Sequence, residues 1–416
     1  MANTIASVLR KTGGRAPGLG QTRALLVIVW IAFQSLRVTD GNGGAVFSPL
    51  WIVPHAVVPA LFAVLGFGLA QAAAAGQSPR AFALDRVRRA GPVLLAAVMG
   101  TALLLGPAFT TGGLRAYVTD PAFALYFLNL VGWPRFDLPG VFEFNDYSEV
   151  VNEALWLTPC FAIVAIGALG AMRSRAPRWF ALLFAGIALT VYAAAETTGL
   201  MPLPGGSVIR NSFVGSALAA IFAGQCGTLC YAWRERLAIA TPILFAAIIA
   251  LGVLAVLAGP GFVDRPGALF AIALLAGAGA LSAALRNWPG SWIAARAAPV
   301  LHGAMLFSFP LQQLAADLGP NRQLALTNLV LSLPLAVVLA WALRWLSVRF
   351  GLAPVRAGPE PEAPVLALPD LRAARSWRNL ARQAAEGLGI AFVVAAAGLI
   401  VILLTIAALQ DDPVGV

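Results

Sequence analysis

The chain has 416 residues, of which 60% are hydrophobic and only 11% are charged. A soluble protein of this size carries about 25% charged residues, so the composition excludes an ordinary soluble globular protein. Apolar runs near the length of a membrane span, separated by short basic or Gly/Pro-rich breaks, instead predict an all-α integral membrane protein. The formal net charge of +10 does not indicate a nucleic-acid-binding protein, because the basic residues gather in the breaks between apolar runs.

The first apolar run reads RALLVIVWIAFQ and extends from Arg23 to Gln34. On a helix these two side chains lie on nearly the same face, roughly 16 Å apart along the axis. An amide inside a membrane span needs a hydrogen-bond partner or a functional role. Gln34 is therefore a candidate site residue.

The apolar runs that follow predict eleven spans in all. We place these helices at residues 22–38, 50–73, 91–109, 149–171, 179–196, 211–232, 238–258, 267–285, 297–317, 323–345 and 387–408. They divide the chain into a basic N-terminal segment (1–21), a ten-helix membrane domain (22–345), a segment 346–386, an extra transmembrane helix (387–408) and a tail (409–416).

The distribution of Lys and Arg predicts the orientation of these helices. With a cytoplasmic N-terminus, most of the 28 basic residues fall on the cytoplasmic side, as the positive-inside rule requires. The exceptions are Arg37, Arg115, Arg135, Arg210, Arg265 and Arg322. We expect a multi-pass protein of the inner (cytoplasmic) membrane with an extracytoplasmic C-terminus.

Two connecting segments have distinctive compositions. Residues 110–148 are rich in aromatic residues and proline, which favours a packed cover or a re-entrant element over a floppy linker. Residues 353–370 are Pro-rich and predict an extended linker. The stretch that follows, LRAARSWRNLARQAAEG, predicts an amphipathic helix on an anionic membrane surface.

The three cysteines, Cys160, Cys226 and Cys230, all lie in apolar runs. None has a partner in an aqueous loop, so we expect no disulfide framework. Cys226 and Cys230 are one helical turn apart, but a metal site would need further ligands. We interpret all three as small packing residues and predict no metal.

Four segments together resemble the acyltransferase 3 family over about residues 20–350. AVLGFGLAQAAAAGQSPRAFALDRVRRAGP resembles its second-helix end and basic loop, and LPGVFEFNDYSEVVNEALWLTP its Asn-x-x-Leu-Trp segment. LHGAMLFSFPLQQL resembles its late helix with a Phe-Pro-x-Gln-Gln sequence. Arg23 and Gln34 have the spacing of its first-helix Arg and His.

This resemblance implies an integral-membrane enzyme of about ten helices. Such enzymes move an acyl group, often acetyl, from cytoplasmic acyl-CoA to a hydroxyl of a sugar, glycolipid or other acceptor. It also implies that the basic segment lies near the CoA phosphates, which arginine pairs well. We accordingly assign Arg23, Arg86, Arg88 and Arg89 to CoA binding. Alternatively, the cluster at residues 80–89 only orients the protein and contacts anionic lipid.

The chain departs from the family pattern at its catalytic positions. Gln34 stands where the family has its first-helix histidine, and glutamine cannot act as a general base. Phe161 replaces a glutamate, Leu65 replaces a serine and His302 replaces a tyrosine.

His55 is therefore the candidate base, because histidine suits proton transfer near neutral pH. In this hypothesis Gln34 orients His55 or the acceptor. The alternative is that His55 satisfies a carbonyl freed by Pro54 or Pro59, and for His302 a structural hydrogen bond is the favoured reading. Glu153 serves as a base, forms an ion pair with Arg37 or Arg210, or is simply exposed at the membrane interface.

The matched motifs supply the remaining candidate residues. We assign Asn152, Trp156 and Gln312 to substrate binding, although Gln312 and Gln313 could instead form hydrogen bonds between helices. The predicted function is acyl transfer from acyl-CoA to a carbohydrate or glycolipid in the bilayer. The alternatives are a catalytically inactive homologue that acts as a partner in glycan modification or export, and a small-molecule transporter.

Overall fold

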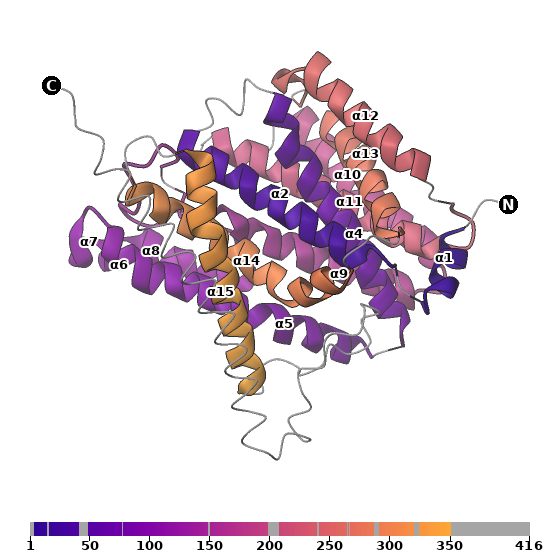
Figure 1. The fold of residues 1–416 in the computed structure, drawn as a ribbon, viewed down its shortest axis with the longest axis horizontal. Coiled ribbons are helices and arrows are strands. Elements are labelled where there is room, and N and C mark those ends of the chain that lie inside the picture. The colour runs from indigo at the N-terminus through magenta and orange to yellow at the C-terminus, as the bar shows by residue number, and fades with distance from the viewer. Residues whose placement is uncertain are drawn as a thin grey trace.

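The computed structural model describes residues 4–14, 16–40, 49–76, 78–148, 150–198, 208–238, 241–263, 265, 267–286, 291–319 and 324–350. Within these ranges the fold is all-helical (Figure 1). The long helices are α2 (Leu19–Asp40), α4 (Ile52–Ala74), α5 (Pro79–Gly100), α9 (Leu157–Arg173), α10 (Pro177–Thr198), α11 (Val208–Ala232), α12 (Thr241–Leu257), α13 (Ala268–Ala284), α14 (Ser291–Asp317) and α15 (Ala325–Arg349). The short ones are α1 (Ile5–Lys11), η1 (Pro49–Trp51), the π-helical turn η2 (Thr101–Leu105), α6 (Gly106–Phe109), α7 (Gly113–Thr119), α8 (Pro121–Tyr126), η3 (Phe127–Val131), η4 (Glu153–Trp156) and η5 (Pro260–Phe262).

The predicted membrane character is confirmed. Among the described residues, five helical segments are long and apolar enough to cross a membrane: Leu19–Asp40, Pro49–Ala74, Pro79–Phe109, Glu153–Arg173 and Ala325–Arg349. Each of the first ten predicted segments overlaps a described helix, although several of the predicted ends differ from those observed. The predicted span 387–408, the Pro-rich linker and the amphipathic helix lie outside the described residues. The chain is thus a helical, multi-pass membrane protein.

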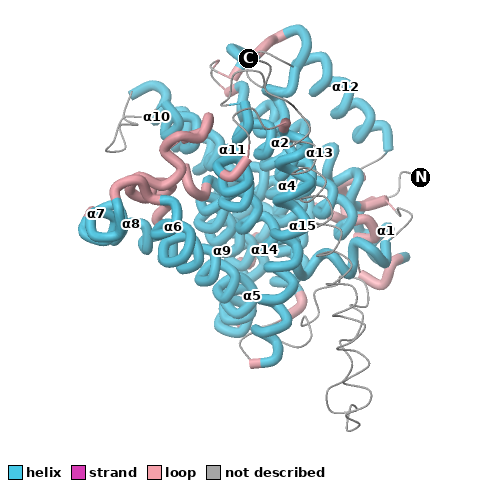
Figure 2. Tube along the Cα trace, turned by 60° about the vertical axis from the view of Figure 1, so that its left-hand side comes forward, coloured by secondary structure: helices cyan, strands magenta, loops and turns pink. Residues whose placement is uncertain are grey.

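Helix α4 runs through the middle of the bundle and is buried along most of its length (Figure 2). It packs against α2, α9, α11 and α13. Glycines allow the closest of these approaches: a Cβ added at Gly66 would lie 1.9 Å from the carbonyl oxygen of Gly224, and one at Gly227 would lie 2.0 Å from that of Ala63. Close backbone contact through small residues is the usual way in which membrane helices associate.

The predicted basic loop at residues 80–89 is wrong, because the segment is helical. Helix α5 begins at Pro79, well before the predicted span start, and Ser78 accepts a hydrogen bond from the Ala81 amide at 3.2 Å. A serine N-cap followed by proline at the first position is a strong helix start. The arginines of this segment therefore project from a helix and not from a loop.

The segment 110–148 is folded and packed, as its composition predicted. Together with α6 it forms a lobe beside the bundle that contains α7, α8 and η3 (Figure 1). Tyr117, Tyr126 and Phe142 are buried in it. The Tyr117 hydroxyl donates a hydrogen bond to the Ala102 carbonyl at 2.7 Å. That carbonyl lies in a π-helical turn whose i+5 donor position is Pro107, which has no N–H.

The burial of Tyr117 predicts a pH effect. Burial raises the pKa of Tyr117 to about 12 from its ordinary value of 10.0. The unfolded chain loses this proton first, so the stability from this group is fully present below pH 10 and is lost as pH rises toward about 12. We expect an ultraviolet titration, taken as wild type minus Tyr117→Phe, to show no tyrosinate near pH 10. Tyrosinate formation at pH 10 in the folded protein would contradict the buried hydrogen bond.

Candidate functional site

Helices α2, α14 and α15 meet along a row of buried polar side chains. We call this row the polar network; its members are Gln34, Ser35, Ser308, Gln312, Gln313 and Asn328, all of them fully buried. Polar groups inside a membrane bundle are costly unless they are hydrogen-bonded, and they often have a functional role. The polar network is therefore a candidate functional site.

Hydrogen bonds in the network join the three helices. The Gln312 amide nitrogen donates to the Ile31 carbonyl of α2 at 2.8 Å. Asn328 of α15 donates to the Gln312 carbonyl at 2.8 Å, and it accepts from the Ser35 hydroxyl at 3.1 Å. Gln312, predicted as a substrate-binding residue, thus makes the interhelical hydrogen bond that was its alternative role.

Gln34 belongs to the network from α2 and contacts α14. Its side-chain oxygen is 3.5 Å from the Ser308 hydroxyl of α14. Its amide nitrogen and the side-chain oxygen of Gln312 are both buried, and neither has a hydrogen-bond partner among the described residues. One orphaned donor and one orphaned acceptor therefore lie on adjacent helices, where a bound carbonyl and a bound hydroxyl could satisfy them.

The segment before η4 covers one end of the network. The Gln313 amide nitrogen donates to the carbonyls of Tyr147 and Val150, both at 2.7 Å, and Asn145 donates to the Gln313 side-chain oxygen at 2.8 Å. Asn152 caps η4 by accepting from the Ala154 amide at 3.1 Å. The residues that follow include Trp156, which is buried.

Asn152 also connects this segment to α14. Its side-chain nitrogen donates to the Leu306 carbonyl at 3.0 Å. In a helix that carbonyl would accept from the residue four positions later, which is Pro310 and has no N–H. Asn152 of the Asn-x-x-Leu-Trp segment therefore donates to the Leu306 carbonyl, which Pro310 of the Phe-Pro-x-Gln-Gln segment cannot do.

Glu153 forms an ion pair with Arg37, which was one of the two pairings predicted for it. A guanidinium nitrogen lies 2.7 and 2.8 Å from the two carboxylate oxygens, and the side chains are only 13% and 15% exposed. Arg37 also donates to the Tyr147 hydroxyl and lies 4.7 Å from the centre of that ring. Burial raises the pKa of the Tyr147 phenol above its ordinary range, so the hydroxyl stays protonated at neutral pH. The side chain of the other predicted partner, Arg210, lies outside the described residues.

The two histidines lie in different surroundings. His55 is half-buried, and its ring centre is 6.4 Å from that of Trp51. The ring centre of His302 lies 6.4 Å from that of Phe161. Phe161 and His302, two of the four positions at which the expected motif residues are missing, are thus neighbours.

The predicted CoA-binding arginines of α5 are arranged around an acid. Asp85 lies 2.9 Å from two nitrogens of Arg89 and 3.7 Å from Arg86, and Arg86 lies 5.0 Å from the Phe82 ring centre. Arg88 is exposed. The structure thus brings Arg86 and Arg89 together. A phosphate at this cluster would compete with Asp85 for both.

Several residues of the site were not singled out from the sequence. Ser35, Ser308 and Asn328 are polar residues within apolar helices, the same signal that identified Gln34.

The cysteines Cys160, Cys226 and Cys230 are unpaired thiols. Among the described residues, no group of three or more His, Cys, Asp or Glu side chains could hold a metal ion.

Comparison with known proteins finds no matching family model, no significantly similar curated protein and no significantly similar solved structure.

Proposed function

We propose that this chain is a membrane acyltransferase that moves an acyl group from acyl-CoA to a hydroxyl of a carbohydrate or glycolipid. Acetyl is the acyl group that we favour. The observation that carries the proposal is the meeting of three family-like segments that are far apart in the sequence. Asn152 bonds to Leu306, Gln312 to Ile31 and Gln313 to Val150. The segments that carry the resemblance therefore contribute side chains to one place in the fold.

The polar network suggests roles for individual groups. The orphaned amide nitrogen of Gln34 would donate to the thioester carbonyl oxygen, and the side-chain oxygen of Gln312 would accept from the acceptor hydroxyl. His55 would take the hydroxyl proton while the alkoxide oxygen forms the new bond to the carbonyl carbon. The carbon–sulfur bond then breaks, and the CoA thiolate takes up the proton that His55 accepted, which returns His55 to its neutral form. Glu153, with Arg37, would position His55 electrostatically.

The finer topology belongs to the same proposal. An eleven-helix chain, with ten helices in an acyltransferase 3-like bundle, a cytoplasmic N-terminus and an extracytoplasmic C-terminus in the inner membrane, would put the arginine-rich start of α5 in the cytoplasm. Arg23, Arg86, Arg88 and Arg89 would then receive the CoA phosphates. In this arrangement Asn152 and Trp156 contact the acceptor from the end of the bundle opposite to the CoA phosphates.

A second candidate, the inactive homologue that binds a partner in glycan modification or export, has observations of its own. Gln34 cannot accept the acceptor's proton, Phe161 packs beside His302, and Glu153 is already paired with Arg37. A homologue that had lost its catalytic base and kept its helical scaffold would show these three features.

An acyl-transfer assay distinguishes the two candidates. We expect purified full-length protein to transfer radiolabelled acetyl from acetyl-CoA to membrane glycan. His55→Gln should reduce the rate by about 10²–10⁴, the usual contribution of a general base, with no change in melting temperature. Gln34→His should add little, because proton transfer already has its base.

The opposite pattern would contradict the enzyme. Wild type without transfer and Gln34→His with transfer would favour the inactive homologue. No transfer by either protein, with both folded, would reject acyl transfer.

A further inference from the structure

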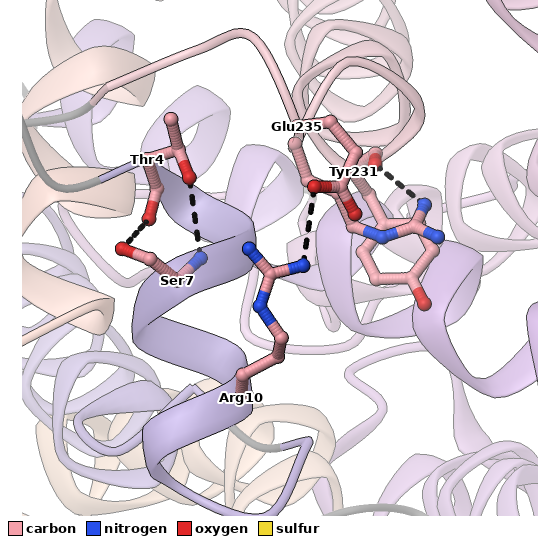
Figure 3. Close-up of polar contacts among 6 residues, drawn as sticks. Thr4, Ser7, Arg10, Tyr231 and Glu235 are labelled. Atoms are coloured by element: carbon pink, nitrogen blue, oxygen red, sulfur yellow. Dashed lines mark hydrogen bonds and ion pairs between the residues drawn. The ribbon is translucent and has the colours of Figure 1, made fainter.

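The N-terminal helix α1 closes a cavity at one end of the bundle. It lies beside the turn that follows α11 (Figure 3). The Ile5 amide donates to the Leu237 carbonyl and the Ala6 amide to the Arg234 carbonyl, each at 2.9 Å. These two bonds satisfy N–H groups that a helix start leaves without partners. Thr4 caps the same end, since its hydroxyl oxygen accepts from the Ser7 amide at 3.2 Å.

The cavity under α1 has a volume of about 220 Å³. It is lined by Ala6, Leu9, Arg10, Gly14, Gln71, Tyr231, Arg234 and Glu235. Pockets for drug-sized ligands are about 300–1,000 Å³, so this one suits a ligand of headgroup size and is too small for a whole acyl-CoA. It is separate from the polar network.

Two arginines and one glutamate, Arg10, Arg234 and Glu235, line this cavity. Arg10 and Glu235 point toward each other in Figure 3, with 3.3 Å between nitrogen and oxygen, but their side chains are 68% and 51% exposed. An ion pair this exposed contributes little and is easily exchanged. Arg234 lies 4.5 Å from the Tyr231 ring centre and donates to the Tyr231 carbonyl at 3.1 Å, which occupies one of its five donors. An anion could therefore take the place of Glu235.

Gln71 adds an independent sign of a ligand. It is only 6% exposed, and its amide nitrogen donates to the Gly14 carbonyl, which fixes the orientation of the amide. Its side-chain oxygen is buried and has no hydrogen-bond partner within the described residues. A buried acceptor of this kind costs free energy until a donor reaches it.

We propose that this cavity binds a phosphate ester that also carries a hydroxyl. The phosphate oxygens would lie between Arg10 and Arg234, and the hydroxyl would donate to the Gln71 side-chain oxygen. Arginine pairs well with phosphate because its planar donors match the oxygens. The ligand is either the headgroup of an anionic phospholipid or a soluble phosphate ester. The proposal goes beyond acyl transfer and does not depend on it.

The test uses purified full-length protein and two kinds of probe. Glycerol 3-phosphate and inorganic phosphate, titrated by calorimetry in detergent, represent the soluble source. Nanodiscs of phosphatidylglycerol or phosphatidylcholine, with native mass spectrometry of the retained lipid, represent the membrane source. We expect glycerol 3-phosphate to bind more tightly than inorganic phosphate, and phosphatidylglycerol to be retained over phosphatidylcholine if the ligand is a lipid.

Charge variants give the sharpest result. Arg10→Gln and Arg234→Gln should each weaken binding about tenfold or more, since each removes a charge-assisted hydrogen bond. Glu235→Gln should tighten binding, because it removes the competing carboxylate. Lys11→Gln removes an equal charge from the exposed side of α1 and should have little effect. Gln71→Leu should abolish the preference for glycerol 3-phosphate over inorganic phosphate.

Three outcomes would overturn the proposal. Glu235→Gln and Arg10→Gln both break the ion pair, so equal weakening by the two would mean that the pair only holds α1 in place. An effect of Lys11→Gln as large as that of Arg10→Gln would mean that surface charge alone attracts the anion. If none of the probes binds, the cavity does not bind a phosphate ester and the proposal is wrong.

Discussion

Replacing Glu153 with alanine should destabilise the protein by about 3–5 kcal/mol, the usual cost of breaking a buried ion pair by removing one of its members. Arg37 and Glu153 are 15% and 13% exposed and lie 2.7 Å apart. The change removes the carboxylate that accepts hydrogen bonds from the Arg37 guanidinium at 2.7 and 2.8 Å. The measurement is the free energy of unfolding in mixed micelles of detergent and dodecyl sulfate.

The chain offers a matched control for this pair. Glu235→Ala breaks the Arg10–Glu235 pair, which is also Arg–Glu but mostly exposed, and it should cost no more than about 1 kcal/mol. The double variant Arg37→Leu/Glu153→Leu should lose less stability than Glu153→Ala alone, because it removes both buried charges together and fills the site with apolar side chains. Equal costs for Glu153→Ala and Glu235→Ala would contradict the buried geometry.

Gly66→Ala and Gly227→Ala should each force α4 and α11 apart. The new Cβ would lie 1.9 or 2.0 Å from a backbone carbonyl oxygen, and no side-chain movement can relieve that clash. Overpacking of a tight core costs about 1–3 kcal/mol and sometimes more, and here the backbone of the central helix must move. We expect a loss at or above the upper end of that range, measured as the yield of folded protein and as its melting temperature.

A glycine-to-alanine control isolates the clash. Gly252 lies within α12, and a Cβ there would meet nothing within 4 Å. Gly252→Ala should therefore be neutral or stabilising by up to about 1 kcal/mol, from helix propensity alone. If Gly66→Ala behaved like Gly252→Ala, the close approach of α4 and α11 would be wrong.

The sequence predicts where helices exist more accurately than it predicts the residues at which they begin and end. The predicted span 267–285 agrees closely with α13 because the apolar run itself defines the helix. The predicted span 91–109 missed the start of α5, since the charged residues before it were taken for a loop. Ser78 and Pro79 carried the missing signal: capping chemistry, and not hydropathy, decides where that helix begins.

The site is only partly readable from the sequence. Gln34 is conspicuous as an amide in an apolar run, but its contact Ser308 is 274 residues away in the sequence, and no local pattern says which helix faces pack together. Pro310 marks a carbonyl without its helical donor, yet only the fold shows that Asn152 reaches it. For Glu153 the sequence narrowed the pairing to Arg37 or Arg210, and the structure shows the bond to Arg37.

The docking of α1 has a consequence for how the protein is made. Arg10 and its partner Glu235 are 225 residues apart in the sequence, so the first helix leaves the ribosome long before the turn it rests against exists. Domains generally fold in the order of their synthesis, N-terminal parts first, whereas α1 can dock only after α11 and the turn that follows it have been made. Docking of α1 therefore comes after the synthesis of α11.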